Sequence, residues 1–202
     1  MKKLDIKFYE RDQVIDIARE LIGKILVTKV DGVCTSGRIV EAEAYQGVID
    51  RACHGFGGRR TARNEHMYAP GGTAYVYICY GMHHLFNVVT NKPEVPDAVL
   101  IRGIDPLEGI TTMLKRTGKK VVDRTLTRGP GNLSRALGIT KLNSGLKLTG
   151  NTICIMDDGK MIPEHEIGCS KRIGVESAGE AANYCYRFYH KGNLFVSASP
   201  SK

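Results

Sequence analysis

Apolar and polar positions near the start of the chain follow first a helical and then a strand-like period. Residues 11–23, RDQVIDIARELIG, place apolar side chains on one helical face, with Asp12 able to cap the helix and Gly23 able to end it. The following segment, KILVTKVDGVCTSGRIV, contains two β-prone runs around an Asp31-Gly32 pair. Such a pair is typical of a two-residue hairpin turn. We therefore predict a short helix followed by a β-hairpin.

The second arm of this hairpin continues through GRIVEAEAYQG, where apolar and acidic positions alternate. Successive side chains of a strand point to opposite faces, so one face is expected to be core and the other to carry two carboxylates and an aromatic ring. The core face would hold Val40, Ala42 and Ala44, and the opposite face Glu41, Glu43 and Tyr45. The acidic face is the first candidate for chemistry.

A second hairpin is predicted farther along the chain. Residues 71–91, GGTAYVYICYGMHHLFNVVTN, hold two β-prone arms around Gly81, with Tyr80 at the tip. The uncharged run of residues 66–91 includes glycines, histidines and tyrosines, so we interpret it as buried sheet and not as a membrane span. An aromatic side chain at a hairpin tip is exposed unless it has a partner, which makes Tyr80 a candidate functional residue.

Helices and a closing strand are predicted in the rest of the chain. In DPLEGITTMLKR, Asp105 can cap a helix that begins at Pro106 and ends near Arg116. Glu108 would complete a capping box. A short helix is expected in GNLSRALGIT, beginning near Asn132. The segment RIGVESAGEAANYCYRFYHKGNLFVS predicts a strand, a turn or short helix, and a closing strand. The pattern as a whole indicates mixed α/β structure.

Composition and charge narrow the possible partners. The 202 residues are 42% hydrophobic and 25% charged, and no linker or repeat divides them, so we expect one domain over residues 1–202. A net charge of +8 favours an anionic partner such as nucleic acid. Basic residues are concentrated in residues 115–135 and in a group of four arginines, either of which could bind phosphate or form a solvated basic loop. The four are Arg51, Arg59, Arg60 and Arg63.

Cysteine usage and motif searches exclude several kinds of site. The six cysteines fall singly, and the first residues, MKKLDIKFYERD, contain no apolar signal-peptide core, so we expect a reducing, cytoplasmic or otherwise intracellular setting. His83 and His84 are adjacent and would diverge on a strand, which suits joint metal binding poorly. The chain has no phosphate loop, dinucleotide fingerprint, zinc protease motif, hydrolase elbow or zinc deaminase pattern. We expect no metal and no cofactor.

What remains is a carboxylate site in a basic, tyrosine-rich chain. Glycoside hydrolysis commonly uses two carboxylates that flank the bond. On one strand, Glu41 and Glu43 would have Cα atoms about 6.6 Å apart on the same side, an awkward arrangement for that purpose. A lone carboxylate that activates water, with aromatic rings around a base and a basic rim, would instead suit an N-glycosylase acting on a nucleotide.

Six blocks of sequence then occur in a fixed order between Ala18 and Ser197. They are GRIVEAEAYQG, ACHGFGGRRTARN, GGTAYVYICYGMHHLFNVV, VLIRGIDPLEG, RGPGNLSRALGI and RIGVESAGE. Together they resemble the alkyladenine (3-methyladenine) DNA glycosylase family. The resemblance implies a curved antiparallel sheet flanked by helices, with a β-hairpin that inserts into DNA. It also implies excision of alkylated or deaminated purines flipped out of duplex DNA. We expect a monomer that needs no cofactor and no membrane.

The resemblance also assigns roles to matching positions of this chain. Glu43 would deprotonate the attacking water, and Glu41 would be its structural neighbour. Tyr45 and Tyr77 would stack on the flipped base. His54 would read the edge of the base through its backbone amide, and Asn87 would reject normal guanine. The preferred base among 3-methyladenine, 7-methylguanine, hypoxanthine and ethenoadenine is not indicated.

Contacts with DNA are likewise implied by the resemblance. Tyr80 would enter the minor groove and fill the space left by the flipped nucleotide. Arg102 and Arg59 would contact the phosphate backbone, although a surface salt bridge is the alternative for both. Two other interpretations of the chain are kept open. One is a non-catalytic RNA-binding module like those appended to tRNA formyltransferases, and the other is a glycosidase acting on free nucleosides.

Overall fold

The Asp31-Gly32 pair turns the chain between the first two long strands of a computed structural model, which describes residues 1–198. Strand β2 (Ile25–Val30) ends at this pair and β3 (Val33–Tyr45) follows it. Both turn residues have a positive φ, 52° and 75°. Two consecutive residues with positive φ match the right-handed twist of the strands they join. The first predicted hairpin is therefore confirmed.

The second predicted hairpin is also confirmed. It consists of β4 (Ala74–Cys79) and β5 (His83–Thr90), which pair in antiparallel register. Tyr80 at the turn has a φ of 50° and a side chain that is 90% exposed. Glycine follows it, as Gly81 with a φ of 73°. The tyrosine thus stands at the tip with no packing partner to explain its position.

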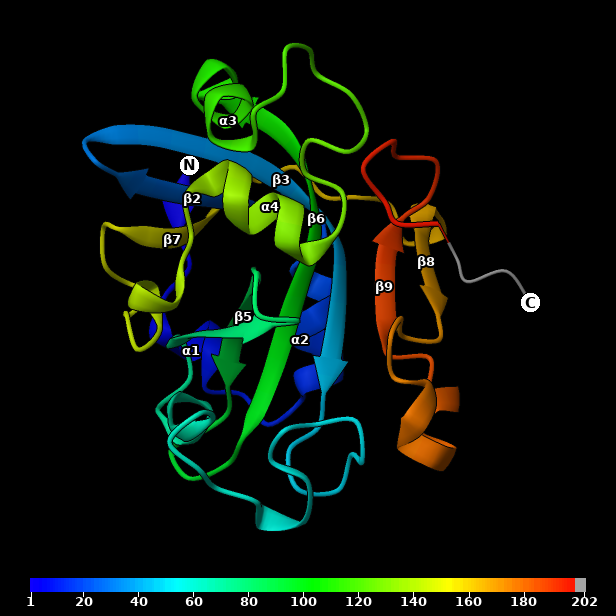
Figure 1. Cartoon of the computed structure of the whole chain (residues 1–202). Coiled ribbons are helices and arrows are strands. Elements are labelled where there is room, and N and C mark those ends of the chain that lie inside the picture. Colours follow the sequence, from blue (N-terminus) through cyan, green and yellow to red (C-terminus); the bar gives the residue numbers. More distant parts are fainter. Residues whose placement is uncertain (199–202) are drawn as a thin grey trace.

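Nine strands within residues 1–198 form one antiparallel sheet (Figure 1). Their order is β1-β7-β2-β3-β6-β5-β4, with β9 beside β3 and β8 beside β9. The long strand β3 has β6 along one edge, and along its other edge it has first β2 and then β9. The remaining strands are β1 (Lys2–Lys3), β6 (Asp97–Glu108), β7 (Ile153–Asp157), β8 (Ile167–Ser170) and β9 (Arg187–His190).

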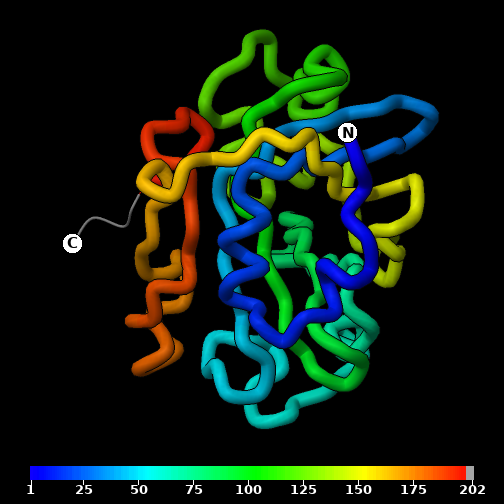
Figure 2. The backbone as a smooth tube through the Cα atoms, turned by 180° about the vertical axis from the view of Figure 1, so that it is seen from behind, coloured from blue at the N-terminus to red at the C-terminus, as the bar shows by residue number. Residues whose placement is uncertain are grey.

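Four α-helices and five 3-10 helices accompany the sheet in the described part of the chain. Figure 2 shows α1 and α2 on the near side when the molecule is seen from behind, whereas α4 lies in front in Figure 1. The α-helices are α1 (Ile6–Tyr9), α2 (Val14–Glu20), α3 (Ile110–Thr117) and α4 (Pro130–Leu137). The 3-10 helices are η1 (Phe56–Gly58), η2 (Glu65–Tyr68), η3 (Lys141–Asn143), η4 (Glu164–Glu166) and η5 (Glu176–Asn183).

The main core lies on one face of the sheet and uses the helical periodicity noted in the sequence. Alternate residues of β3, including Ala42 and Ala44, pack with Ile17 of α2, with Leu21 directly after that helix, and with Leu133 of α4. All five are fully buried. Burial of such a continuous apolar face is the main source of stability for a mixed sheet-and-helix fold. It also leaves the other face of the same strands available for polar residues.

The helix predicted to begin at Pro106 begins later. Strand β6 continues through Pro106 to Glu108, pairing with β3 near Gly37. Gly109 then turns the chain with a φ of 73°, and α3 starts at the next residue. The expected cap and capping box are therefore wrong, because pairing with the long strand β3 outweighs the local helix signal. A register shift at Gly37 accommodates the proline, which has no N–H to offer the ladder.

Three smaller expectations are also corrected. The first residue of α2 is preceded by Gln13, whose side chain makes no capping bond, and Asp12 instead accepts a hydrogen bond from the Gln13 side chain. In the run expected to be buried sheet, residues 65–68 form a 3-10 helix and the sheet begins at Ala74. The strand expected at the start of RIGVESAGE is irregular, and the ordered strand of that region is β8, which precedes it. The mixed α/β class itself is confirmed.

Candidate active site

Four adjacent strands present a row of functional side chains on the face opposite the main core. Residues directly opposite one another on antiparallel strands point to the same face. Glu43 of β3 lies opposite Leu100 of β6, which lies opposite Asn87 of β5, which lies opposite Tyr75 of β4. Tyr45 is two residues from Glu43 and shares its face. The alternation seen in the sequence therefore places glutamate, asparagine and tyrosines on one surface.

A cavity of about 210 Å³ opens on this surface. The loop between β3 and β4 covers one side of it, and the segment before η5 contributes Gly174 and Val175. All four residues expected to bind the base contribute to its wall. They are Tyr45, His54, Tyr77 and Asn87. The fold thus brings together residues that span more than forty positions of sequence.

Aromatic rings define the shape of the cavity. The rings of His54 and Tyr77 are 4.6 Å apart and those of Tyr75 and Tyr77 are 5.5 Å apart. His54 Nδ1 and the Tyr75 hydroxyl share a hydrogen bond of 2.8 Å, which fixes the imidazole against the wall. Burial lowers the pKa of His54, and the charges of Arg63 and Arg59 lower it further. The imidazole is therefore neutral at physiological pH.

Two backbone groups hold Asn87 in a single orientation. Its Nδ2 donates to the carbonyl oxygens of Tyr75 at 3.1 Å and Leu85 at 3.2 Å. Since both acceptors are carbonyls, the amide nitrogen is assigned to that side and the amide oxygen to the other. The side chain is only 4% exposed and forms part of the cavity wall. Asn87 is therefore a rigid element of this wall.

Glu43 is fully buried and does not itself line the cavity, but it is bonded to Tyr45, which does. The Tyr45 hydroxyl donates to its Oε2 at 2.9 Å, and the backbone N–H of Ile173 donates to its Oε1 at 2.8 Å. Arg102 Nη1 also donates to Oε2, at 3.3 Å. Burial raises the pKa of Glu43 above its usual value, although these three donors favour the charged form. A carboxylate with a raised pKa next to a cavity has the properties of a general base.

Glu41 occupies a different electrostatic environment. It receives hydrogen bonds from Arg102 Nε at 3.1 Å, Arg187 Nε at 2.7 Å and the backbone N–H of Ser197 at 2.8 Å. Burial alone would raise its pKa, but the charges of the two arginines and the Ser197 amide hold it below the usual value. Glu41 is consequently a stable anion that links Arg102 to Arg187.

A pair of β-bulges produces this arrangement. Strand β3 has one extra residue, Val40, immediately before Glu41, and β6 has one, Arg102, immediately before Gly103. The two insertions cancel, so the strands regain their register at once. Because of the first insertion, Glu41 points to the face of Glu43 and not into the main core. Bulges next to active sites commonly re-aim side chains in this way.

The expected DNA-contacting residues lie in three different environments. Tyr80 is at the exposed hairpin tip, and Arg59 is exposed on the loop between β3 and β4. The side chain of Arg102, in contrast, is 9% exposed and is ion-paired with both Glu41 and Glu43. This placement favours a role beside the glutamates over the phosphate contact expected from the sequence. The buried strand bulge that carries Arg102 has no local sequence signal.

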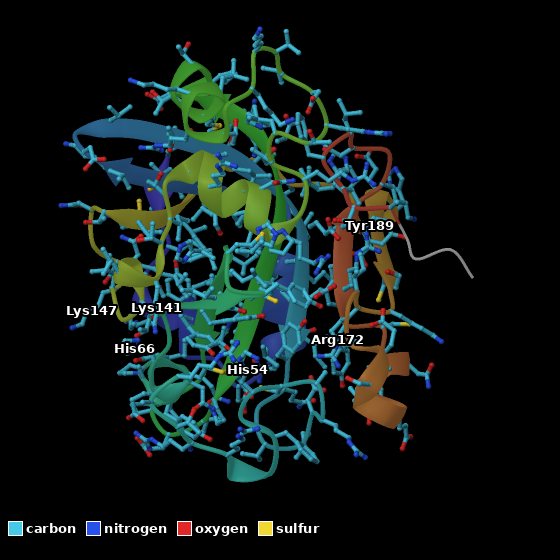
Figure 3. All side chains as sticks on the ribbon, in the orientation of Figure 1. His54, His66, Lys141, Lys147, Arg172 and Tyr189 are labelled. Atoms are coloured by element: carbon cyan, nitrogen blue, oxygen red, sulfur yellow. The ribbon has the colours of Figure 1, made fainter. Side chains whose placement is uncertain are left out.

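One important residue was missed by the sequence analysis. Arg172 lies beside Tyr45 with its guanidinium 4.7 Å from the ring centre, and it forms a buried ion pair with Asp50. It also donates to the backbone oxygen of Ala44 at 2.8 Å. In the view of Figure 3, Arg172 and His54 lie on either side of the end of β3. Arg172 is the first residue of the RIGVESAGE block, so a signal was present, but its partner Asp50 could not be inferred from spacing.

The segment around Ser197 closes the site from behind. Arg187 Nη2 donates to the Ser197 backbone oxygen at 2.8 Å, while the Ser197 N–H bonds Glu41. The backbone of Phe195 passes so near Gly103 that a Cβ there would lie 2.6 Å from the Phe195 oxygen. Gly103 therefore permits this segment to cover the buried charges.

Comparisons with known proteins show the family of the chain. The family model described as methylpurine-DNA glycosylase (MPG) matches residues 7–194. A Clostridium acetobutylicum protein named "Putative 3-methyladenine DNA glycosylase" is 44% identical, over 96% of this chain and 97% of its own length. Proteins of the same name from Bacillus cytotoxicus and Desulfitobacterium hafniense are 46% and 44% identical, over 94% and 98% of this chain and 97% and 99% of their own lengths. The chain therefore belongs to the methylpurine-DNA glycosylase family.

Proposed function

We propose that this protein is a monofunctional DNA N-glycosylase that removes damaged purines from duplex DNA, with Glu43 as its general base. The observation that carries the proposal is a fully buried glutamate with a raised pKa that accepts a hydrogen bond from Tyr45, a wall residue of the aromatic cavity. The family match supplies DNA as the class of substrate. Of the two adjacent glutamates, only Glu43 combines proximity to the cavity with a raised pKa. Opposite shifts in paired carboxylates are a guide to which of them moves a proton.

The proposed reaction needs one proton acceptor and a place for the departing base. Glu43 takes a proton from a water molecule as the water oxygen attacks C1′ of the deoxyribose. The bond between C1′ and the purine nitrogen breaks, and its electron pair leaves with the base. A positioned base of this kind contributes about a hundredfold to ten-thousandfold in rate. Arg102 and the Ile173 amide hold the carboxylate in position through the bonds described above.

Two wall groups are proposed to select the base. The backbone N–H of His54 donates no hydrogen bond within residues 1–198, so it is free to donate to an acceptor such as the oxygen of hypoxanthine. Asn87 is held by two backbone carbonyls and cannot move aside for the 2-amino group of guanine. Stacking of the base on Tyr45 and Tyr77 would supply affinity without selectivity.

Engagement of duplex DNA is proposed to use the β4–β5 hairpin. Tyr80 at its tip is 90% exposed, and the neighbouring Met82 is 71% exposed. Exposed apolar wedges of this kind enter base steps and compensate for a flipped nucleotide. The excess positive charge of the chain favours attraction to the DNA backbone. The open cavity and the exposed hairpin tip therefore both support the extrusion of a base from the DNA duplex.

The proposal is tested with purified protein and its Glu43→Gln variant on duplex oligonucleotides. Substrates carry one hypoxanthine or ethenoadenine, or are methylated, and released base and abasic sites are measured. We expect wild type to release base and Glu43→Gln to bind the same duplex but excise at least about a hundredfold more slowly. Glu10→Gln, at an exposed position outside the site, is the matched control and should retain full activity.

The outcomes separate the competing interpretations. Excision by Glu43→Gln at the wild-type rate would remove Glu43 from the proposed role. Tight RNA binding with no excision from any substrate would favour the binding-module interpretation. Efficient hydrolysis of free nucleosides with no preference for duplex DNA would indicate a nucleosidase. Buried Glu43 already argues against the binding-module interpretation, since an RNA surface has no use for a desolvated carboxylate.

A further inference from the structure

Two exposed cysteines meet at the base of the segment that joins β8 to β9. Of the six cysteines, Cys169 and Cys185 are exposed, whereas two others are half-buried and two are buried. Cys169 lies on β8 opposite Phe188 of β9, and Cys185 lies two residues before β9 begins. The Cys169 thiol donates to the backbone oxygen of Cys185 at 2.7 Å. The two residues are therefore in direct contact, although they are 16 positions apart in sequence.

This contact places the two sulfur atoms close to each other. A carbonyl oxygen lies about 2.4 Å from the Cα of its own residue, so the Cys169 Sγ is no more than about 5 Å from the Cys185 Cα. Burial raises the pKa of Cys169, and the charge of Cys185 and a hydrogen bond with its side chain raise it further. The two thiols are therefore neighbours in the folded protein, as disulfide formation requires.

The segment between the two cysteines completes the candidate active site. The backbone N–H of Ile173 donates to Glu43 at 2.8 Å, and Gly174 and Val175 line the aromatic cavity. Arg172, which lies beside the end of β3 in Figure 3, belongs to the same segment. Movement of this segment therefore changes both the cavity wall and the hydrogen bonding of Glu43.

Few packing contacts hold the segment in place. Most of its side chains are exposed or half-buried, and its 3-10 helix η5 is interrupted at Gly179, where φ is 62° and ψ is −131°. Its main attachment is Arg172, which bonds the backbone oxygens of Ala44 and Ala181 and forms an ion pair with Asp50. A segment with few buried apolar contacts opens locally more readily than the sheet beside it. A covalent link between its ends would restrict that opening.

We propose that Cys169 and Cys185 are a site of reversible disulfide formation, and that the disulfide fastens the segment bearing Ile173 over Glu43. In a reducing setting the pair stays as two thiols, and a rise in a small-molecule disulfide such as oxidised glutathione converts it. The fastened segment keeps its amide on Glu43. Oxidation at this site therefore preserves the candidate active site and does not block it.

The reaction is an ordinary thiol–disulfide exchange. One of the two cysteine thiolates attacks a sulfur of oxidised glutathione, forms a mixed disulfide and releases one glutathione thiolate. The other cysteine loses its proton, attacks the protein sulfur of the mixed disulfide and releases the second glutathione thiolate. Two protein thiols are thereby oxidised to one disulfide, and oxidised glutathione is reduced to two thiols that take up the two protons.

The first test identifies the bond. The purified full chain is incubated with oxidised glutathione at about pH 8.5, where thiolates are populated, and mass spectrometry follows alkylation of the remaining thiols and digestion. We expect peptides joined through Cys169 and Cys185, with no glutathione retained on either residue. Cys34→Ser, at a half-buried position on β3, is the matched control and should form the same bond. Glutathione that stays attached to Cys169 or Cys185 in place of the joined peptides would overturn the proposal.

The second test measures whether the bond fastens the segment. A disulfide that closes a loop of this length should raise the Tm of wild type by about 6 to 12 °C. It should also slow hydrogen exchange of the amides in residues 171–184 at least about tenfold. Cys169→Ser and Cys185→Ser, treated in the same way, should show neither change. An oxidised wild type with the bond formed but with the Tm and exchange rates of the reduced protein would refute the fastening role.

Excision of hypoxanthine from duplex DNA is the one readout that rests on the proposed function. Neither cysteine lines the aromatic cavity, so oxidised wild type should excise at least as fast as the reduced protein. A loss of excision that dithiothreitol reverses would overturn the proposal, because the bond would then block the site. No excision in either redox state, together with the joined peptides, the higher Tm and the slower exchange, would support the disulfide site and contradict the glycosylase proposal alone.

Discussion

Glu41 and Glu43 are two positions apart on one strand, yet their surroundings push their pKa values in opposite directions. Glu43 has one arginine partner, whereas Glu41 has two and also bonds the Ser197 amide. Arg102 is shared, with its Nε directed to Glu41 and its Nη1 to Glu43. Glu41 therefore determines how much of the Arg102 charge reaches Glu43. We regard Glu41 as a positioning residue for the proposed base.

The Glu41→Gln substitution tests this relation. Loss of the Glu41 charge leaves Arg102 to Glu43 and removes a like charge that raises the Glu43 pKa. Because the proposed general base, Glu43, can accept a proton only when ionised, excision should slow as the pH falls through its pKa. In the variant this acid limb should move to lower pH, and excision at neutral pH should be about tenfold to a hundredfold slower. Single-turnover excision of 7-methylguanine across the pH range measures both effects.

A merely structural role for Glu41 makes a different prediction. It would lower the amount of active protein without moving the acid limb of the pH profile. An unchanged profile in a folded Glu41→Gln protein, verified by circular dichroism, would therefore exclude the positioning role. The Glu10→Gln control should reproduce the wild-type curve.

Asn87 offers a second prediction at the scale of single residues. Shortening it in Asn87→Ala opens the cavity wall where the 2-amino group of guanine would lie. We expect release of normal guanine from undamaged duplex to rise at least about tenfold, while hypoxanthine release changes less. The measurement is the ratio of the two release rates. A ratio equal to that of wild type would show that Asn87 does not exclude guanine.

Site residues and their partners differ in how far they could be predicted. Alternation along GRIVEAEAYQG correctly placed Glu43 and Tyr45 on one face, and the family resemblance supplied the other wall residues. Arg187 and Ser197 could not be found, because they approach Glu41 from more than 140 positions away in sequence. The bulges were also invisible, since an extra residue in a strand changes the pairing without changing the local composition.

At the scale of elements, the β4–β5 hairpin carries the exposed Tyr80 at its tip. Tyr80→Ala should weaken binding to a hypoxanthine duplex and slow its excision, each by about tenfold, because an inserted side chain offsets a few kcal/mol of unstacking. A single-stranded substrate, which needs no flipping, should be affected much less. The ratio of duplex to single-strand excision gives the measurement.

Met161→Ala is a matched control for the hairpin. Met161 is 87% exposed and borders a different depression, near Ile22 and Lys24. Its removal should leave the ratio unchanged. If Tyr80→Ala excises the duplex and the single-stranded substrate at the same rates as wild type does, the wedge role is rejected.

Local sequence signals located hairpins better than helix boundaries. The Asp31-Gly32 and Tyr80-Gly81 turns were found because their positive φ values require a small set of residues. The start of α3 was misplaced because a cap, a proline and a glutamate at helix spacing also fit the end of a strand. The segment is a strand and not a helix because β3 is long enough to pair with β6 through Pro106. Such pairing is a property of the assembled sheet.

At the scale of the whole molecule, the buried charges govern acid stability. The lowered pKa of Glu41 means that the unfolded chain takes up a proton before the folded protein does as pH falls. The stability that Glu41 provides is therefore complete above its ordinary pKa of 4.5 and is lost as pH falls through the folded value. The contribution of Glu43 to stability has the opposite pH dependence, because its raised pKa makes the folded protein bind the proton first.

Because the two glutamates affect the pH dependence of stability in opposite directions, Glu43 is replaced in both proteins of the comparison. Urea unfolding of Glu43→Gln is compared with that of the Glu41→Gln/Glu43→Gln double variant from about pH 7 to pH 3. The Glu43→Gln protein should lose stability as pH falls below 4.5, and the double variant should lose less. At neutral pH the double variant should be less stable by about 3 kcal/mol, because Arg187 is left buried with its charge only partly compensated. Parallel stability curves would show that Glu41 does not carry the effect.

The C-terminal closure of the site also has a consequence for biosynthesis. Glu41 leaves the ribosome long before two of its three partners, since Arg187 and Ser197 follow it by 146 and 156 residues. At usual rates of translation this delay is about 7 to 30 s. During that time β3 can pair with β2 and β6, and Glu41 can bond Arg102, but its second arginine partner, Arg187 of β9, is still absent. The charge network around Glu41 is therefore completed late in synthesis, when Arg187 and Ser197 reach it.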